Sequence, residues 1–314
     1  MRGAGLTAFG VLRALAAAAL IAAAALAGGC GEDDSAAQNG DLFDAERAFA
    51  DVEAQVRIGP RESGSPGGRE EVMLIESSLR EAGVEDVRVQ SPHANVIGTI
   101  PGSEPGAVVV GAHHDTKGGI PGFVGANDGA SGVAVVLELA RSLEAPLEGP
   151  SIHLALFDAE EARGDRPFAE DGTRGSRMYV DYAREGGMQG TPPLEEIQAM
   201  VLFDMVGDCD LQIPLEGGDS DPGLHARFGE AAEAATGDPA PFVGTSGPVS
   251  DDHVPFAEAG VPAVDLIDFT FGGDDSPGEW WHTPEDTLDK VCAESLDAVG
   301  EAAMRALPDL PDQP

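Results

Sequence analysis

The sequence predicts an α/β fold, a single three-layer α/β/α domain built on a central mixed, mostly parallel sheet. Along the 314 residues, short apolar runs rich in β-branched residues alternate with segments of helical periodicity, and this alternation indicates a sheet covered by helices. The runs at 152–157 and 200–204 are apolar almost throughout, as expected for strands buried on both faces. The length suits one large domain or two small ones, and we find no internal repeat and no convincing second domain.

Residues 1–30 carry targeting signals ahead of the domain. Arg2 and Arg13 accompany an alanine-rich apolar run at 14–27. This run is too short and too weakly hydrophobic for a membrane span, so residues 1–29 are predicted to be a lipoprotein-type signal peptide. The stretch LAGGC at 26–30 resembles a bacterial lipobox, in which the cysteine, here Cys30, is lipidated. Ordinary secretion with cleavage nearby is the alternative, and both imply export, to the cell envelope through the lipid or to the periplasm or medium.

Residues 30–41 are polar and predict a flexible linker, residues 42–308 are predicted to fold, and 309–314 form a tail. A helix begins near Leu42, turn formers occupy 59–67, and a second helix runs to about Ala82 with Gly83 as its C-terminal stop. A third helix follows Asp128 and reaches about Leu143. The remaining predicted elements are strands at 84–90, 95–100, 107–112, 152–157, 200–204 and 261–267, a helix at 224–235, and two short helices after His282, with Thr283-Pro284 as a helix start.

The composition excludes some classes of partner. A formal net charge of −38 argues against nucleic acid and against anionic membrane surfaces, so membrane contact is expected only through a lipid on Cys30. An oxidising compartment permits a disulfide between Cys209 and Cys292. The sequence does not say whether the two are close, and two buried free thiols are the slightly favoured expectation. The sequence gives no signal for the oligomeric state.

Adjacent carboxylates, Glu160 and Glu161, follow the predicted strand at 152–157. Neighbouring acids repel each other unless a cation or a proton lies between them. They predict a division of labour in which Glu161 binds a metal and Glu160 acts as a general base. A solvated acidic turn is the alternative.

Four more candidates lie at the ends of other elements. His113 closes the strand at 107–112 and points to the same side as Asp115, an acid that can orient the imidazole. Asp128 lies at a helix start, where it could instead be a helix cap. Asp204 ends a strand, and the alternative is a salt-bridged or capping acid. His282, as a lone histidine, has a structural role as its alternative. Nitrogen and oxygen ligands without thiolates suit a catalytic zinc, and strand ends are where α/β sheets place their sites.

Six separated motifs occur in an order that resembles family twenty-eight of the metallopeptidases, which holds zinc aminopeptidases and glutaminyl cyclases. The motifs lie between residues 59 and 299 and read HHD, GANDGASG, FDAEE, FDMVG, DDHVPF and WHT. The resemblance implies a zinc-exopeptidase-like fold. It also implies that Asp128, Glu161 and His282 bind one zinc, that His113 and Asp204 bind a second zinc when there is one, and that Glu160 is the acid/base.

Further details resemble the cyclase branch. These are Lys117, the stretches 123–126 and 175–177, the DDHVPF motif and Trp281. The branch implies that Asp204 and Asp252 join a hydrogen-bond network beside a single zinc and that Trp281 lines the substrate pocket. The loop at 162–173 lacks the tryptophan of the animal cyclases, for which Phe168 is the substitute, and their cysteine pair near the site is also missing.

The sequence therefore predicts a zinc enzyme that acts on the N-terminal residue of peptides or proteins. The leading expectation is a glutaminyl-peptide cyclotransferase, which converts N-terminal glutamine to pyroglutamate and releases ammonia. The alternative is an aminopeptidase, which hydrolyses the first peptide bond with the same ligands. A third hypothesis is a non-catalytic lipoprotein that binds metal or peptide.

Overall fold

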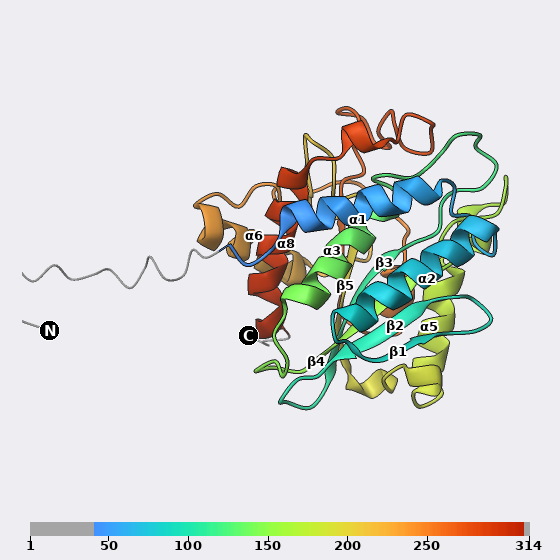
Figure 1. Ribbon diagram of the computed structural model, residues 1–314. Coiled ribbons are helices and arrows are strands. Elements are labelled where there is room, and N and C mark those ends of the chain that lie inside the picture. Colours follow the sequence, from blue (N-terminus) through green and yellow to red (C-terminus); the bar gives the residue numbers. More distant parts are fainter. Residues whose placement is uncertain (1–40, 311–314) are drawn as a thin grey trace, which may run out of the picture. The chain divides into compact units, whose positions relative to one another are not determined.

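The computed structural model describes residues 41–310 (Figure 1). The expected signal peptide, the lipidation site Cys30, nearly all of the linker and the last four residues lie outside the described residues. Within residues 41–310, no helix combines the length and the apolar surface that a membrane span needs. Secondary structure extends from a helix that begins at Ala45 to a 3₁₀ turn that ends at Asp309.

A six-stranded sheet with the order β1-β2-β4-β3-β5-β6 forms the centre of the fold. The strands β3, β4, β5 and β6 are parallel, and β2 is antiparallel to both of its neighbours. The mixed, mostly parallel sheet that the sequence predicts is therefore confirmed. The strands are β1 (Glu85–Val89), β2 (Val96–Ile100), β3 (Ala107–His113), β4 (Ser151–Phe157), β5 (Ile197–Asp204) and β6 (Ala263–Ile267).

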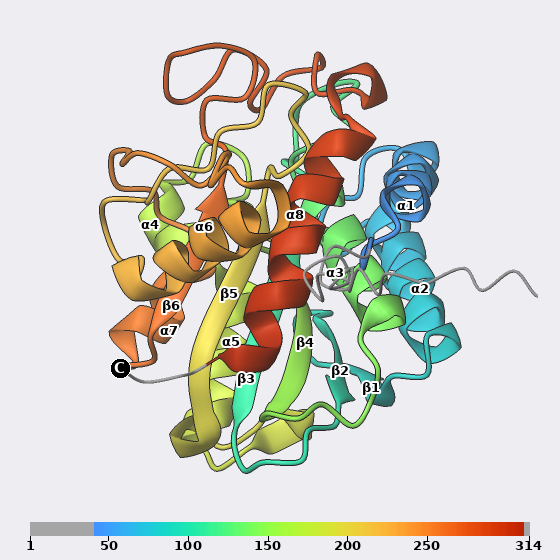
Figure 2. The same ribbon diagram turned by 90° about the vertical axis from the view of Figure 1, so that its left-hand side faces the viewer.

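Helices cover both faces of this sheet and complete the three layers. The larger core lies between one face and the helices α1 (Ala45–Ile58), α2 (Pro66–Glu81), α3 (Ala130–Ser142), α6 (Pro222–Thr236) and α8 (Ala293–Ala306). Figure 2 shows α3, α6 and α8 in front of the sheet and α5 behind it. The smaller core lies under α5 (Arg174–Arg184) and α7 (Val254–Glu258). There Phe157, Tyr179 and Phe256 form a cluster of three packed rings with centroids 5.6 to 6.1 Å apart.

Short helical turns connect these elements. They are α4 (Phe168–Asp171), η2 (Met188–Gly190), η3 (Leu194–Glu196), η4 (Leu288–Lys290) and η5 (Leu307–Asp309).

The structure differs from the sequence-based expectation near the C-terminus. Instead of two short helices after His282, a 3₁₀ turn precedes the single 14-residue helix α8. Thr283 and Pro284 do not start a helix, because His282 adopts a left-handed φ of 53° and the Thr283 hydroxyl donates back to the carbonyl of Trp280. The helices α5 and α7 were not predicted at all.

The expectation of two free thiols is wrong. Cys209 and Cys292 form a disulfide with their Cα atoms 4.9 Å apart. Backbone hydrogen bonds from Cys292 to Gly207 and from Cys209 to Lys290 accompany it. The disulfide therefore fastens the loop after β5 to the segment that leads into α8.

Reduction of this disulfide is expected to destabilise the fold. It joins residues 83 positions apart, and removing a crosslink that closes a long loop costs about 2–4 kcal/mol because the unfolded chain gains entropy. Denaturant unfolding of the wild type with and without a thiol reductant measures the loss. The double variant C209S/C292S serves as the control, whose stability the reductant leaves unchanged. An equal free energy of unfolding for reduced and oxidised wild type would contradict the expectation.

Candidate metal centre

The candidate residues meet at the carboxyl ends of the parallel strands. His113 is the last residue of β3 and Asp204 the last of β5, while Glu160 and Glu161 follow β4. The chain passes from β3 to β4 on one side and then crosses to β5 on the other. This is a topological switch point, the place where open α/β sheets bind ligands.

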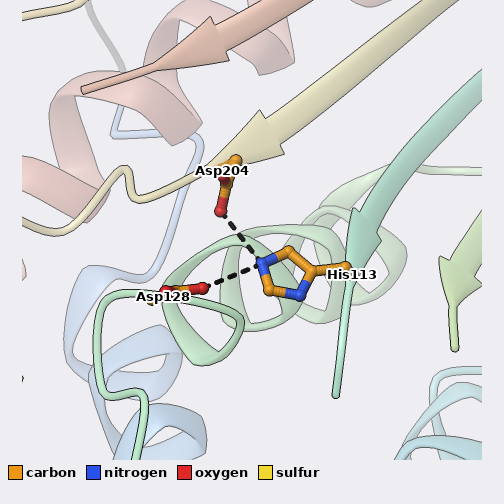
Figure 3. A group of neighbouring side chains, drawn as sticks. All are labelled: His113, Asp128 and Asp204. Atoms are coloured by element: carbon orange, nitrogen blue, oxygen red, sulfur yellow. Dashed lines mark hydrogen bonds and ion pairs between the residues drawn. The ribbon is translucent and has the colours of Figure 1, made fainter. Parts of the chain in front are cut away.

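His113 faces two carboxylates (Figure 3). Its Nε2 lies 3.2 Å from Asp128 Oδ1 and 3.1 Å from Asp204 Oδ1. Its Nδ1 lies 3.0 Å from the backbone carbonyl of Asp115, to which it donates, which leaves Nε2 to face the acids. Burial disfavours the imidazolium, but Asp204 and Asp128 together raise the pKa of His113 well above its usual value.

A second group shares Asp128 with the first. His282 Nε2 lies 2.9 Å from Glu161 Oε1 and 3.4 Å from Asp128 Oδ2. Asp128 thus offers one oxygen to each histidine, which is the geometry of a carboxylate that bridges two positions. The two groups, His113-Asp128-Asp204 and Asp128-Glu161-His282, each present ligand atoms within 4.8 Å of one another.

The donor set fits a zinc ion. Tetrahedral zinc with bonds of about 2.1 Å places its ligand atoms about 3.4 Å apart, close to the separations found here. Asp128 Oδ2 and Glu161 Oε2 are buried without a hydrogen-bond partner, and such oxygens are costly unless a cation satisfies them.

Two alternatives from the sequence are excluded by burial and by helix geometry. Glu160 and Glu161 are only 7% and 5% exposed, so they do not form a solvated turn. Asp128 does not cap α3, because the N-cap is Gly129 and no side chain caps that end.

The loop that carries Asp128 requires its glycines. Gly125 has φ +54° and Gly129 has φ +94°. A Cβ on Gly125 would lie 2.3 Å from the Asp128 carbonyl oxygen. Arg61, which is fully buried, donates from Nη1 to Val124 O and from Nη2 to Gly125 O.

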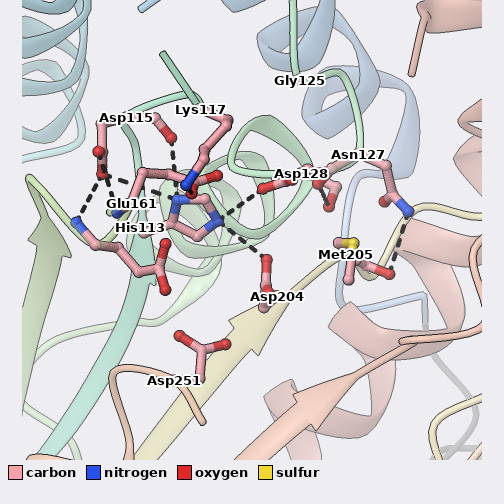
Figure 4. A network of polar contacts seen from close by, with 12 residues as sticks. His113, Asp115, Lys117, Gly125, Asn127, Asp128, Glu161, Asp204, Met205 and Asp251 are labelled. Atoms are coloured by element: carbon pink, nitrogen blue, oxygen red, sulfur yellow. Dashed lines mark hydrogen bonds and ion pairs between the residues drawn. The ribbon is translucent and has the colours of Figure 1, made fainter. Parts of the chain in front are cut away.

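Asp286 supports the loop that carries Asp128. Its two carboxylate oxygens accept the backbone N–H groups of Asn127 at 2.8 Å and of Asp128 at 3.0 Å. Asn127 in turn donates to the Met205 carbonyl (Figure 4). Sequence reasoning missed Arg61 and Asp286, because neither belongs to a motif of ligand-type residues.

Asp115 positions the two glutamates. Its carboxylate accepts the N–H of Glu160 at 3.0 Å and the N–H of Glu161 at 3.3 Å. Ala159 makes the preceding turn with φ 60°. Lys117 Nζ donates to Ala162 O at 2.7 Å and lies 3.5 Å from Glu161 Oε2 (Figure 4). Asp115 and Lys117 therefore lie beside the ligand groups.

Glu160 belongs to neither ligand group, and it lines the cavity that opens onto them. Burial, reinforced by the neighbouring Glu161, raises the pKa of Glu160 well above its ordinary range. An acid of this kind, outside the ligand groups and next to them, is a candidate for proton transfer.

The cavity has a volume of about 270 Å³ and an acidic floor. Trp281 stacks on His282 with ring centroids 3.9 Å apart and packs against Phe269 at 5.2 Å. Phe168, the expected substitute for the missing tryptophan, also lines the cavity, as do Ile267 and Val249. The part of the cavity lining formed by these five side chains is therefore apolar, apart from the indole N–H.

The structure separates the roles of the paired acids Asp251 and Asp252. Asp251 lines the cavity (Figure 4), and burial, followed by Asp265, raises its pKa well above the usual value. Asp252 does not line the cavity; it is fully buried and accepts the hydroxyl of Ser176. Burial raises the pKa of Asp252 to about 7. Sequence reasoning chose Asp252, and the DDH motif gave no signal that the first acid faces the cavity.

Glu216 holds the loop that carries Asp251, and it was also missed. Glu216 is 1% exposed, and its carboxylate accepts backbone N–H groups from both loops that it touches. The donors are Gly218, Asp219, Ser220 and Val249. His253 Nε2 lies 3.4 Å from Glu216 Oε2. One buried anion thus fixes the Val249 side of the cavity.

Comparisons with known proteins agree with this geometry. Residues 95–307 match the profile of peptidase family M28. The chain is 32% identical over 211 residues to aminopeptidase YwaD of Bacillus subtilis, which covers 65% of this chain and 41% of that protein. It is 28% identical over 287 residues to the glutaminyl-peptide cyclotransferase of Boiga irregularis, covering 77% of this chain and 75% of that protein. The solved glutaminyl cyclase of Porphyromonas gingivalis superposes with a TM-score of 0.72 at 31% identity, covering 85% of this chain and 99% of that one.

Removing the support under Asp128 is expected to weaken metal binding. Asp286→Asn replaces one of the two acceptors with a donor, and loss of such an outer contact commonly costs 10- to 100-fold in metal affinity. Competition titration with a zinc chelator measures the change. Glu285→Gln, an exposed neighbour, is the matched control. Equal zinc affinity in the two variants would show that Asp286 does not support the site.

Proposed function

Because this chain belongs to peptidase family M28, we propose that it is a zinc-dependent enzyme that cyclises the N-terminal glutamine of peptides or proteins to pyroglutamate and releases ammonia. One observation carries the proposal. Beside the candidate ligands, and outside both ligand groups, a buried carboxyl group with a raised pKa, Glu160, lines a small cavity. The similarity to solved glutaminyl cyclases over most of the chain supports the choice of reaction.

Asp128, Glu161 and His282 would hold the zinc, and His113 and Asp204 would hold a second ion where one binds. A bound zinc polarises the carbonyl of the substrate side-chain amide. The cyclase requires only one ion, and in that case His113 and Asp204 keep the hydrogen bond of 3.1 Å that joins them.

Glu160 moves the proton. The bond that forms joins the substrate α-nitrogen to the side-chain amide carbon, and the bond that breaks releases the amide nitrogen. Glu160 takes a proton from the α-amine and returns it to the departing nitrogen, which leaves as ammonia, so no net proton is consumed. Its raised pKa makes it a better proton acceptor than an ordinary carboxylate, as the first transfer requires.

The remaining side chains of the cavity orient the substrate and exclude water. The ring of Trp281, held by Phe269 and stacked on His282, would cover the glutamine side chain. Asp251, on the opposite wall near Glu160 and Asp204, would hold the α-amino group by a hydrogen bond.

An aminopeptidase is the second candidate, and one observation favours it. The two ligand groups share Asp128, whose oxygens face different histidines, which is the arrangement of a two-metal site. In that reaction Glu160 takes a proton from the attacking water and gives it to the leaving amine. The similarity to a Bacillus subtilis aminopeptidase supports this candidate.

The products distinguish the two reactions. Purified zinc-loaded protein is incubated with two peptides that differ only in their first residue, Gln or Leu, and the products are weighed by mass spectrometry. Loss of ammonia from the Gln peptide alone is expected. Loss of the first residue from the Leu peptide identifies an aminopeptidase instead, and zinc per chain is counted in the same sample. No change in any peptide of a broad panel would contradict both and favour a non-catalytic binding protein.

Glu160→Gln is expected to retain zinc and lose at least about a hundredfold in kcat, because a general base typically contributes that much. Turnover under saturating substrate and zinc stoichiometry are measured together. The exposed Glu170→Gln, from the loop after Glu161, is the control. A Glu160→Gln enzyme with wild-type kcat would remove Glu160 from the reaction.

A further inference from the structure

Three arginines gather around one acid beside the cavity. Asp171 Oδ1 lies 2.5 Å from Arg163 Nη2 and 3.0 Å from Arg166 Nη1. The other oxygen, Oδ2, lies 3.0 Å from Arg174 Nη1. These hydrogen bonds hold the pKa of Asp171 far below its usual range, so the acid is charged. We call Arg163, Arg166 and Arg174 the arginine cluster.

The arginine cluster borders two adjoining cavities. Arg166 lines the metal cavity, whereas Arg163 and Arg174 line a second cavity of about 330 Å³. Glu161 and Ala162 form part of the wall of both. Arg174 also donates to the Glu161 carbonyl at 3.1 Å, so the cluster is attached to the metal site and is not a detached surface feature.

The arginine cluster and Asp171 together are positively charged, although the chain as a whole is strongly acidic. Three guanidinium groups face one carboxylate, Asp171, which leaves two positive charges, while the whole chain carries −38 with only 18 Lys and Arg. Asp165 and Glu170 belong to the same loop but line neither cavity.

The acids that do line the second cavity are already engaged. Asp115 accepts the backbone N–H groups of Glu160 and Glu161, Glu161 belongs to a ligand group, and Glu62 lies 3.4 Å from the N–H of Gly119. Arg163 and Arg166 have side chains that are 60% exposed. Arg163 already holds Asp171 through both Nε and Nη2, whereas Arg166 contacts Asp171 through Nη1 alone. The remaining N–H groups of Arg166, with those on Nη1 of Arg163, could therefore receive a second carboxylate.

From this arrangement we infer that Arg163 and Arg166 form a carboxylate subsite for the part of the substrate that follows its first residue. The inference rests on the proposed function. The metal cavity, at about 270 Å³, has room for the N-terminal residue, and each further residue extends the chain by up to about 3.5 Å, toward the arginine cluster. The preferred substrates are then peptides with Asp or Glu in the second or third position, or dipeptides and tripeptides whose C-terminal carboxylate falls there.

Four peptides test the subsite on the zinc-loaded full chain. Gln-Ala-Ala-amide is the reference, Gln-Glu-Ala-amide and Gln-Lys-Ala-amide differ in the charge of the second residue, and Gln-Ala-Ala with a free carboxylate tests the C-terminal source. The Glu peptide is expected to exceed the Lys peptide about three- to fivefold in kcat/KM through a lower KM, the range for a partly exposed ion pair. Added salt is expected to reduce the difference. Equal kcat/KM for the Glu and Lys peptides would overturn the inference.

Two variants of the arginine cluster and one control variant assign the effect to it. Arg166→Gln is expected to bring the ratio of the Glu peptide to the reference close to one. Arg184→Gln, an exposed arginine on α5 paired with Asp181, is the matched control and keeps the wild-type ratio. A ratio unchanged by Arg166→Gln and by Arg163→Gln would overturn the inference, and the unfolding midpoint of each variant shows that it is folded.

Binding separates failure of the subsite from failure of the proposed function. The same four peptides are titrated calorimetrically into zinc-loaded Glu160→Gln protein, in which no turnover is needed. The subsite predicts the same order of Kd even if the wild type releases no ammonia. Absence of ammonia with this order of Kd rejects the cyclase alone, whereas equal Kd values reject the subsite alone.

Discussion

The site depends on the crowding of negative charge in a place that water scarcely reaches. Asp128, Glu160, Glu161, Asp204 and Asp251 are all less than a tenth exposed and lie around one small cavity. Buried carboxylates repel one another and lose their hydration. A cluster of them is therefore stable only when protons or cations lie between its members. His113, His282 and Lys117 supply part of the positive charge that these carboxylates require. One oxygen of Asp128 and one of Glu161 still accept no hydrogen bond, and a metal cation placed between them would supply the rest. The groups around this position come from three strand ends, the loop before α3 and a C-terminal loop.

A second rule governs the loops around the site. Three buried acids accept backbone N–H groups of a neighbouring loop: Asp115 holds 160–161, Asp286 holds 127–128, and Glu216 holds 218–220 together with 249. Loops contain few apolar side chains to pack, so these hydrogen bonds fix them where a core cannot. The backbone beside the site is strained, because Ala159, Met205 and His282 adopt left-handed φ values of 45–60°. Such conformations persist only where the surrounding contacts hold them.

The sequence predicted well those features that local pattern determines. Apolar runs located five of the six strands, and the exposed β1 was located by its valines between turn formers. Ligand-type residues at strand ends located the two groups around Asp128. It predicted poorly what depends on contacts between distant segments. The charged helix α5 was missed because its buried stripe, which includes Tyr179 and Val180, meets a core built by other strands. The disulfide joins residues 83 positions apart. Asp251 and Asp252 are adjacent, and no local pattern in the sequence shows which of the two faces the cavity.

The shape of the cavity explains how one ligand set serves two reactions. Hydrolysis requires a water and an extended peptide, whereas cyclisation requires the glutamine side chain to fold back until its amide carbon meets the α-nitrogen. In the proposed function, a cavity of about 270 Å³, with the rings of Trp281 and Phe269 on its wall, would suit the folded side chain. Cyclisation joins two atoms of the same substrate, so in the proposed mechanism Glu160 would need to move only the proton of the α-amine and no attacking water. The proposed preference for cyclisation therefore rests on the shape of the cavity and not on the ligands, which the two reactions share.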